Sequence, residues 1–168
     1  MNASARNLLL KRQTNSSGFT LIELMVTIAV LAIIVSIAAP NISTQLANQR
    51  VKSTAATLAN ALKEAKVESI IRRQNVTVVY NNTSTPKTIK LRANSSDIAS
   101  YNINRQSSVT QTITPSNITS IVFLPDKTID KGATLVYTVC DTGSNNETPR
   151  QVSLSRIGNV DTTNAGSC

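Results

Sequence analysis

Residues 18–39 read GFTLIELMVTIAVLAIIVSIAA, and Glu23 is the only charged residue among them. The 21 residues from Phe19 to Ala39 would form a helix of about 31 Å, which is close to the thickness of the bilayer hydrocarbon. We therefore predict one membrane-spanning helix over residues 19–39.

The residues before this apolar run form a basic and polar leader, residues 1–18. The leader holds Arg6, Lys11 and Arg12 and no acidic residue. Because basic residues stay on the cytoplasmic side of a span, the N-terminus is expected in the cytoplasm and the chain beyond residue 39 on the exported side. A secretory signal is cut after its apolar stretch. Here the candidate site precedes that stretch, so cleavage would leave the helix attached.

Glu23 needs an explanation because a carboxylate within a membrane span is unfavourable. Cleavage between Gly18 and Phe19 would create an ammonium group four residues before Glu23, at the same end of the helix. Glu23 of one subunit would then neutralise the ammonium of a neighbour in an assembly. The alternative is that Glu23 lies near the membrane interface and reaches the headgroups, and the residues alone leave both interpretations open.

The motif GFTLIE at residues 18–23 resembles the processing site of type IV prepilins and type II secretion pseudopilins. In that family a membrane aspartyl peptidase cuts after the glycine and methylates the new N-terminus. The resemblance implies cleavage after Gly18 by prepilin peptidase, N-methylation of Phe19 and an assembly role for Glu23. It also implies an inner-membrane location with a periplasmic head, followed by entry into a pilus or pseudopilus. The implied partners are minor and major pilins or pseudopilins and the inner-membrane assembly platform.

After the span, Pro40 removes a backbone hydrogen bond, and we expect a helix kink there. An amphipathic helix is expected over residues 40–74, continuing into the head. Its charged residues are typical of a solvated helix face. Its apolar stripe, which should cover the sheet of the head, recurs at four-three spacing: Val51, Ala55, Leu58, Leu62, Ala65 and Ser69.

Residues 75–168 are expected to form a periplasmic β-rich head. The apolar period changes to two, β-branched residues become frequent, and turn residues separate the runs. Strands are expected at 76–80, 88–92, 109–114, 118–124, 133–140 and 151–155. The predicted fold class is α+β. In the pilin fold that the resemblance implies, a long N-terminal helix packs on an antiparallel β-sheet head.

Cys140 and Cys168 are the two cysteines of the chain, and both follow the span. An exported pair of this kind indicates one disulfide, and the alternative is two free thiols. The bridge would close a loop of about 29 residues and contribute roughly 3.5 kcal/mol in the chain-entropy model. It would tether the C-terminus.

The head is also similar to the GspH/FimT group of minor pilins and pseudopilins, which includes FimU-like proteins. The similarity rests on a helix entering a strand at Val76, on IVFLP at 121–125 before a turn, and on QVSLS at 151–155 leading to Gly158. Some members capture DNA through a Gly-Arg-x-Arg motif near the C-terminus. Residues 158–161 read GNVD here, so both arginines are missing. Arg150 and Arg156 lie nearby in the sequence and are candidates for polyanion contacts.

Composition argues against an enzyme. The chain of 168 residues has 17 Lys and Arg against 9 Asp and Glu, a net charge of +8 that falls to +5 without the leader, and it has no His. The commonest general base and metal ligand are therefore absent, and Asp126 and Asp130 are typical of turn residues. We expect no catalytic, cofactor or metal site.

Three functions remain from this sequence. We expect first a minor type IV pilin that helps initiate or cap pilus assembly and so supports twitching motility. A type II secretion pseudopilin of the GspH type is the alternative. A DNA-binding minor pilin for natural transformation is the second alternative, and DNA is not the favoured partner.

Overall fold

The computed structural model describes residues 18–144 and 146–168, with the side chains of 38–41 left out. The chain divides into two compact units, one ending at Ala39 and one running from Pro40 to Cys168. The predicted leader lies outside the described residues except for Gly18. The expected kink at Pro40 falls among the residues whose side chains are not described.

Helix α1 runs from Leu21 to Arg72 and includes both helical segments expected from the sequence. Among the described residues, no single helix meets the length and composition of a membrane span by itself, whereas the pieces Leu21–Ile37 and Ile42–Arg72 meet them as a pair.

The helix ends in a Schellman motif: Arg73 takes a left-handed φ of 52°, its N–H donates to the carbonyl of Ile70, and the N–H of Gln74 donates to the carbonyl of Ser69. This turn directs the chain into the first strand.

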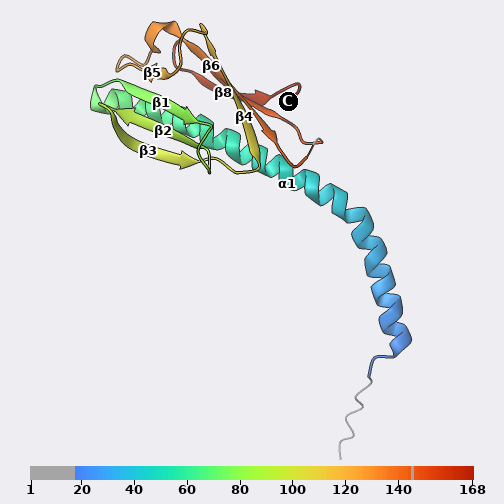
Figure 1. The fold of residues 1–168 in the computed structure, drawn as a ribbon. Helices are drawn as coiled ribbons and strands as arrows, with labels where there is room; N and C mark the ends of the chain where they lie inside the picture. Colours follow the sequence, from blue (N-terminus) through green and yellow to red (C-terminus); the bar gives the residue numbers. More distant parts are fainter. Residues whose placement is uncertain (1–17, 145) are drawn as a thin grey trace, which may run out of the picture. The chain divides into compact units, whose positions relative to one another are not determined.

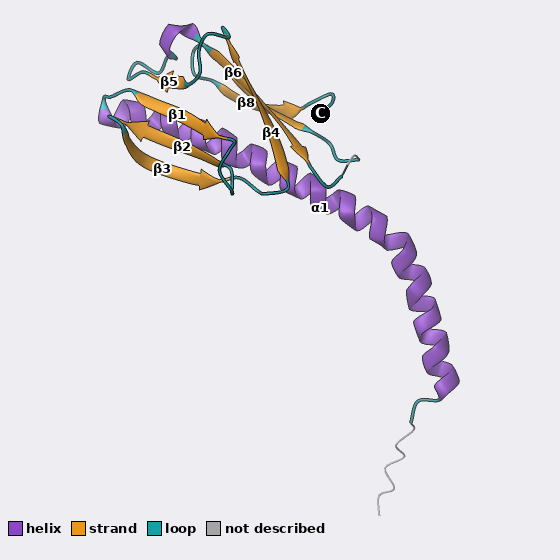
Figure 2. Cartoon of the chain, viewed as in Figure 1, coloured by secondary structure: helices purple, strands orange, loops and turns teal. Residues whose placement is uncertain are grey.

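The head contains two antiparallel sheets of four strands each, and both lie along α1 (Figures 1 and 2). The first sheet has the order β3-β2-β1-β5, and the second has the order β4-β6-β7-β8. A short 3-10 helix, η1 (Asp130–Gly132), precedes β6. The strands are β1 (Val76–Asn81), β2 (Thr88–Ala93), β3 (Ser96–Asn102), β4 (Ser107–Thr114), β5 (Ile121–Phe123), β6 (Thr134–Asp141), β7 (Arg150–Leu154) and β8 (Val160–Asn164).

The predicted class, a long helix on antiparallel strands, is confirmed, but the pattern missed two strands and the division into two sheets. β3 follows β2 through Asn94 and Ser95, which both have positive φ values of 48° and 68°. Such a two-residue hairpin turn normally contains glycine, so the sequence signal was weak. β8 is an outer strand with mostly exposed side chains, and it lacks the alternation of a half-buried strand. β5 begins at Ile121 because residues 115–118 form a turn, in which the N–H of Ile118 bonds to Pro115.

The predicted stripe of α1 forms the centre of the head. Its six side chains, Val51, Ala55, Leu58, Leu62, Ala65 and Ser69, are each no more than 1% exposed. The five apolar ones share one cluster with residues of both sheets, including Phe123 and Tyr137. The two buried hydroxyls of this helix face have partners: Ser69 donates to the carbonyl of Leu124, and Thr54 bonds to Ser107. One helix face therefore serves as the shared core of both sheets.

Replacing Leu62 with alanine tests this shared core. We expect Leu62→Ala to lower the free energy of unfolding by about 3 kcal/mol, because it leaves a cavity at a fully buried position. The matched control is Asn60→Ala on the exposed side of the same helix, with an expected change within about 0.5 kcal/mol. Guanidinium unfolding of the full-length chain in detergent micelles measures both. Equal effects of the two variants would contradict the shared core.

Candidate assembly site and charged surfaces

The start of α1 is fixed by a reciprocal contact between Thr20 and Glu23. The backbone N–H of Glu23 donates to Thr20 Oγ1 over 3.2 Å, and that hydroxyl lies 3.5 Å from Glu23 Oε2. Threonine followed three residues later by glutamate is the spacing of a capping box. A carboxylate in the first turn also complements the helix dipole. This local role of Glu23 was not among the predictions, although the spacing of Thr20 and Glu23 in the sequence indicates it.

The bond expected to be cut lies just outside the helix. Gly18 and Phe19 precede Leu21, where α1 begins, and neither is in regular secondary structure. Phe19 is 79% exposed, and no atom lies within 4 Å of where a Cβ on Gly18 would stand. Among the described residues, nothing therefore covers this peptide bond.

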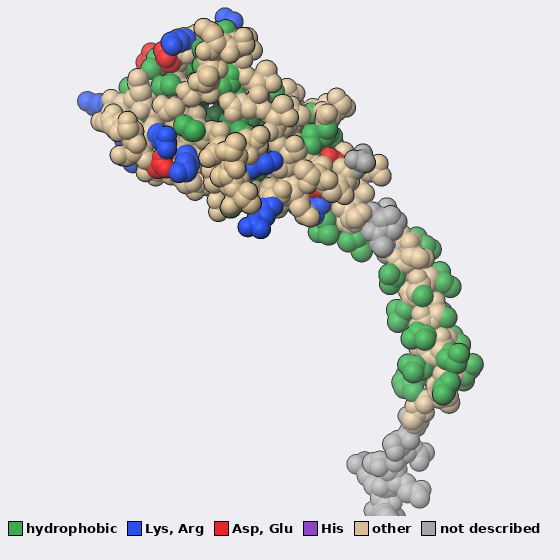
Figure 3. All heavy atoms as spheres, viewed as in Figure 1, with side chains coloured by type: hydrophobic (Ala, Val, Ile, Leu, Met, Phe, Trp, Pro, Cys, Tyr) green, Lys and Arg blue, Asp and Glu red, His purple; other side chains and the backbone are tan. Residues whose placement is uncertain are grey.

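The following segment is apolar on all sides. Its large apolar side chains from Leu21 to Ile37 are between 50% and 76% exposed within the chain, and they gather along this segment in Figure 3. Two of its hydroxyls bond within the helix, from Thr27 to the carbonyl of Leu24 and from Ser36 to that of Ile33. An apolar surface this large marks contact with a membrane or with other chains.

Arg150 and Arg156, the residues singled out for polyanion contacts, are not brought together. Arg150 begins β7, and Arg156 lies two residues beyond its end. Strand β7 alone, from Arg150 to Leu154, covers about 13 Å, and Arg156 lies in the turn that follows it. Arg150 shares a groove with Lys52 and Lys63 of α1. The backbone of Arg156 instead bonds to Ile129 beside η1, whose Lys131 is another cation.

The place of the DNA-capture motif is held tightly by packing. Gly158 has a φ of 70°, and a Cβ there would stand 2.6 Å from the carbonyl oxygen of Lys127. Only glycine fits this close approach of two turns. Lys66 Nζ donates to the Gly158 carbonyl over 2.9 Å. Lys66 of α1 therefore brings a cation to this turn, whereas the two positions at which the motif has arginines hold Asn159 and Asp161.

Two family models match the chain. Residues 13–39 match the prokaryotic N-terminal methylation motif, and residues 54–158 match the type II transport protein GspH. The chain belongs to the GspH family of minor pilins and pseudopilins. The first match contains the capped helix start, and the second covers the head from within α1 to Gly158, which includes β1 to β7. No curated protein matches the GspH-family chain in a sequence search.

Solved structures of minor pilins and pseudopilins share the fold. One crystal form of the type IV minor pilin FimU of Pseudomonas aeruginosa aligns with a TM-score of 0.55 at 16% identity, covering 70% of this chain and 98% of FimU. A second crystal form aligns with a TM-score of 0.56 at 18% identity, covering 71% of this chain and 96% of FimU. The minor pseudopilin EpsH of the Vibrio cholerae type 2 secretion system aligns with a TM-score of 0.53 at 10% identity, covering 70% of this chain and 99% of EpsH. At these identities the likeness shows the fold.

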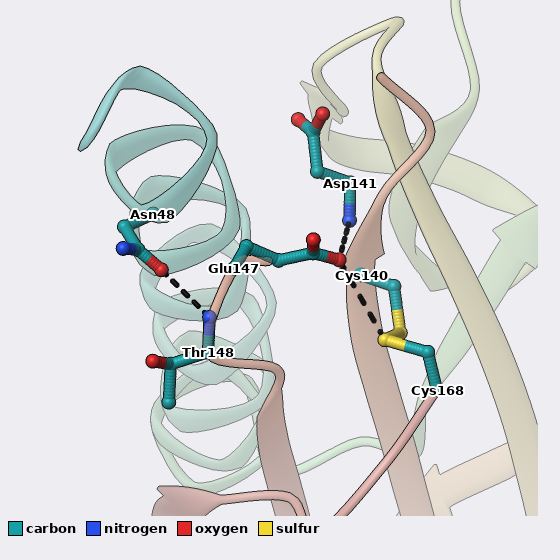
Figure 4. Close-up of a disulfide and its surroundings, with 6 residues drawn as sticks. All are labelled: Asn48, Cys140, Asp141, Glu147, Thr148 and Cys168. Carbon is teal, nitrogen blue, oxygen red and sulfur yellow. Dashed lines mark hydrogen bonds between the residues drawn. A yellow bond between two sulfur atoms is a disulfide. The ribbon is translucent and has the colours of Figure 1, made fainter. Parts of the chain in front are cut away.

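In this GspH-family head, Cys140 and Cys168 form a disulfide with a Cα–Cα distance of 6.0 Å (Figure 4). The side chain of Glu147 extends toward this disulfide. Its Oε1 accepts a hydrogen bond from the N–H of Asp141 and lies 3.7 Å from the Cys168 sulfur. The two sulfurs and this carboxylate lie close together. Because sulfurs in a disulfide are not thiolates, the three do not form a metal site. The loop is also attached to α1, since the N–H of Thr148 donates to Asn48 over 2.7 Å.

Arg50 and Asp141 connect α1 to the end of β6 beside this loop. Arg50 donates two hydrogen bonds to the carboxylate, of 2.6 and 3.1 Å, and the Asp141 side chain is 0% exposed. The N–H of Gly143 is a further donor to it. The hydrogen bond from Arg50 lowers the pKa of Asp141 below its ordinary value. The two residues are 91 positions apart, so no local sequence pattern indicates that they pair.

This ion pair makes the head sensitive to acid. Because the folded-state pKa of Asp141 is lowered, its contribution to stability is complete above the unfolded value of about 3.9 and disappears as the pH falls through the folded value. We expect Asp141→Asn to cost about 3 kcal/mol at neutral pH and to reduce the loss of stability below pH ~4. Thermal unfolding of the full chain between pH 7 and 2 measures both.

Asp97→Asn is the matched control for this measurement. The pKa of Asp97 is also lowered, by hydrogen bonds from Lys90 and Arg92, but its side chain is 35% exposed. We expect it to cost much less than Asp141→Asn at neutral pH, because solvent screens an exposed ion pair. If both variants had equal effects, the ion pair of Asp141 would have no special role at the helix.

Proposed function

We propose that this chain is a minor pilin of a type IV pilus, which helps to initiate or cap filament assembly. Prepilin peptidase cuts it after Gly18 and methylates Phe19. The mature chain waits in the inner membrane as a single-pass protein with its N-terminus cytoplasmic and its head periplasmic. It then moves into the filament, where residues 19–39 of neighbouring subunits bury one another. The uncovered bond before a capped apolar helix is the observation that carries this proposal.

Glu23 sets the register between neighbouring helices in this proposal. Within the described residues its side chain contacts Thr20 through Oε2 alone, so the other carboxylate oxygen is available to a second subunit. Cleavage places a new ammonium on Phe19, at the same helix end. Burying these two charges together in an apolar bundle is far less costly than burying either alone. Pairing therefore favours the staggered arrangement in which each Glu23 meets the N-terminus of the next subunit.

A type II secretion pseudopilin is the second candidate. The observation in its favour is the shared fold of EpsH, a minor pseudopilin of such a system, whose TM-score of 0.53 is close to those of FimU. The two roles use the same helix and the same processing. They differ in the machine that the subunit serves.

The deciding experiment is intact mass measurement and N-terminal sequencing of the chain recovered from membranes and from sheared surface filaments of its native host. Mature chain beginning at N-methyl Phe19 in the filaments supports the minor pilin. Processed chain confined to membranes favours the secretion pseudopilin. A chain that still begins at Met1 in both fractions would overturn the proposal.

Replacing Glu23 with glutamine separates its charge from its capping role. Glutamine still fits the third position of a capping box, so Glu23→Gln keeps the helix start and removes the negative charge. We expect cleavage and membrane abundance to stay unchanged, and the amount in sheared filaments to fall at least tenfold, because the neighbour's ammonium is left unpaired. Immunoblots of the two fractions measure both.

Thr20→Ser is the control for this variant, since serine retains the hydroxyl that caps the helix. We expect its assembly to match that of the wild type. Normal assembly of Glu23→Gln would show that Glu23 acts through the cap alone, and would remove the proposed pairing.

A further inference from the structure

A groove of about 320 Å³ lies between α1 and the strands β7 and β8. Three of its lining residues are cations, Lys52 and Lys63 from α1 and Arg150 from β7. The remaining residues are small or polar: Ala55, Ala56, Ala59, Asn60 and Thr162. The groove is part of the head unit, which begins at Pro40.

The helix geometry places the two lysines at either end of the groove. Lys52 and Lys63 are eleven residues apart, which is three turns of helix, so they share one side of α1 about 16 Å apart. The alanines between them leave a shallow floor. Such a floor lets the backbone of a bound segment approach the helix closely.

The strand register directs Arg150 toward the same groove. Side chains alternate across a strand, and Val152 and Leu154 of β7 are buried against the core. Arg150 therefore lies on the sheet face turned toward α1. Thr162 of β8 pairs with Val152 and lies on that face as well, so the edge of the second sheet forms the opposite wall.

The three cations of the groove have no carboxylate partner among the described residues. The ion pairs of those residues use Arg50, Arg72, Lys90 and Arg92. Glu64, the carboxylate next to Lys63 in the sequence, accepts the hydroxyl of Tyr101 instead. Positive charge in the groove is therefore left to be neutralised from outside the chain.

We propose that this groove binds an acidic segment of a different pilin-type subunit, so that carboxylates meet Lys52, Lys63 and Arg150 and small side chains pack on Ala56. The inference rests on the proposed function, because the occupant is a neighbour in the same assembly. Carboxylates about 16 Å apart correspond to about five residues of extended chain or eleven of helix.

The charges of the chain favour a different subunit over a second copy. Asp97, Glu68 and Asp141 already form ion pairs within the head. A second copy would offer Asp126, Asp130 and Asp161, which form no ion pair among the described residues. Two copies that each carry a net charge of +5 without the leader repel one another, however, whereas an acidic segment of a different subunit is attracted. A nucleic acid would also supply negative charge, but sequence-tolerant binding of single strands depends on aromatic stacking, and no aromatic residue lines the groove.

Photo-cross-linking in the native host tests the proposal on the full-length chain. Benzoylphenylalanine is placed at Asn60 on the groove floor, and the cross-linked peptide is identified by mass spectrometry. We expect a peptide of another pilin-type subunit that contains Asp or Glu. The triple variant Lys52→Gln, Lys63→Gln, Arg150→Gln should lower the yield at least fivefold.

The matched control removes the same number of charges elsewhere. The control variant combines Lys127→Gln, Lys131→Gln and Arg156→Gln, three positions at or beyond the other end of β7. We expect it to lower the cross-link yield less than twofold. Ala56→Trp fills the groove without changing its charge, at an exposed helix position, and should lower the yield as the groove variant does. Intact mass confirms cleavage and the disulfide in each variant, so a misfolded variant is recognised.

Three results would overturn the proposal. The first is an unchanged yield in both groove variants, and the second is a cross-link from Asn60 only to copies of this chain or to no pilin. The third concerns a labelled oligonucleotide and the purified full chain in detergent. The proposal fails if the oligonucleotide binds the wild-type chain but not the groove triple variant, while that variant keeps the cross-link from Asn60. The proposed function fails separately, when the wild-type chain is not cut after Gly18 or never leaves the membrane.

Discussion

The head depends on burial of one face of α1. The side chains from Val51 to Ser69 that form this face are fully or almost fully buried, and they contact the inner faces of two sheets that do not share a strand. Each sheet alone has four strands and one apolar face to cover. Because α1 covers both, the two sheets have one continuous core, and a cavity on the helix face reaches both of them.

Polar contacts fix where the strands lie along this helix. Near its start in the head, Arg50 binds Asp141 at the end of β6. Near its end, Ser69 binds the carbonyl of Leu124 after β5. Apolar burial has no direction, whereas hydrogen bonds to buried groups are costly to leave unmade. The apolar stripe therefore holds the sheets against the helix, and these bonds set the register.

How far the sequence predicts this structure depends on how local each signal is. The stripe of α1 and six strands follow a period within a few residues. The stripe agrees with the structure, and all six strands are present, although β5 is shorter than the predicted strand at 118–124. β8 was missed because an exposed outer strand has no alternating pattern. The hairpin at Asn94 and Ser95 lacks the glycine that marks such turns. The pair of Arg50 and Asp141 joins residues far apart in the chain, and no local pattern could indicate it.

The candidate site shows the same difference between local and distant signals. GFTLIE at residues 18–23 was recognised because its chemistry is contained in six consecutive residues, and its capping contact lies within that motif. Arg150 and Arg156 were grouped because they are close in sequence, but an extended strand moves neighbours in sequence about 3.3 Å apart per residue. They therefore belong to two surfaces. Arg150 shares its groove with Lys52 and Lys63, which are some hundred residues earlier in the chain. Only the folded head therefore shows that three cations, none in an ion pair among the described residues, line one groove.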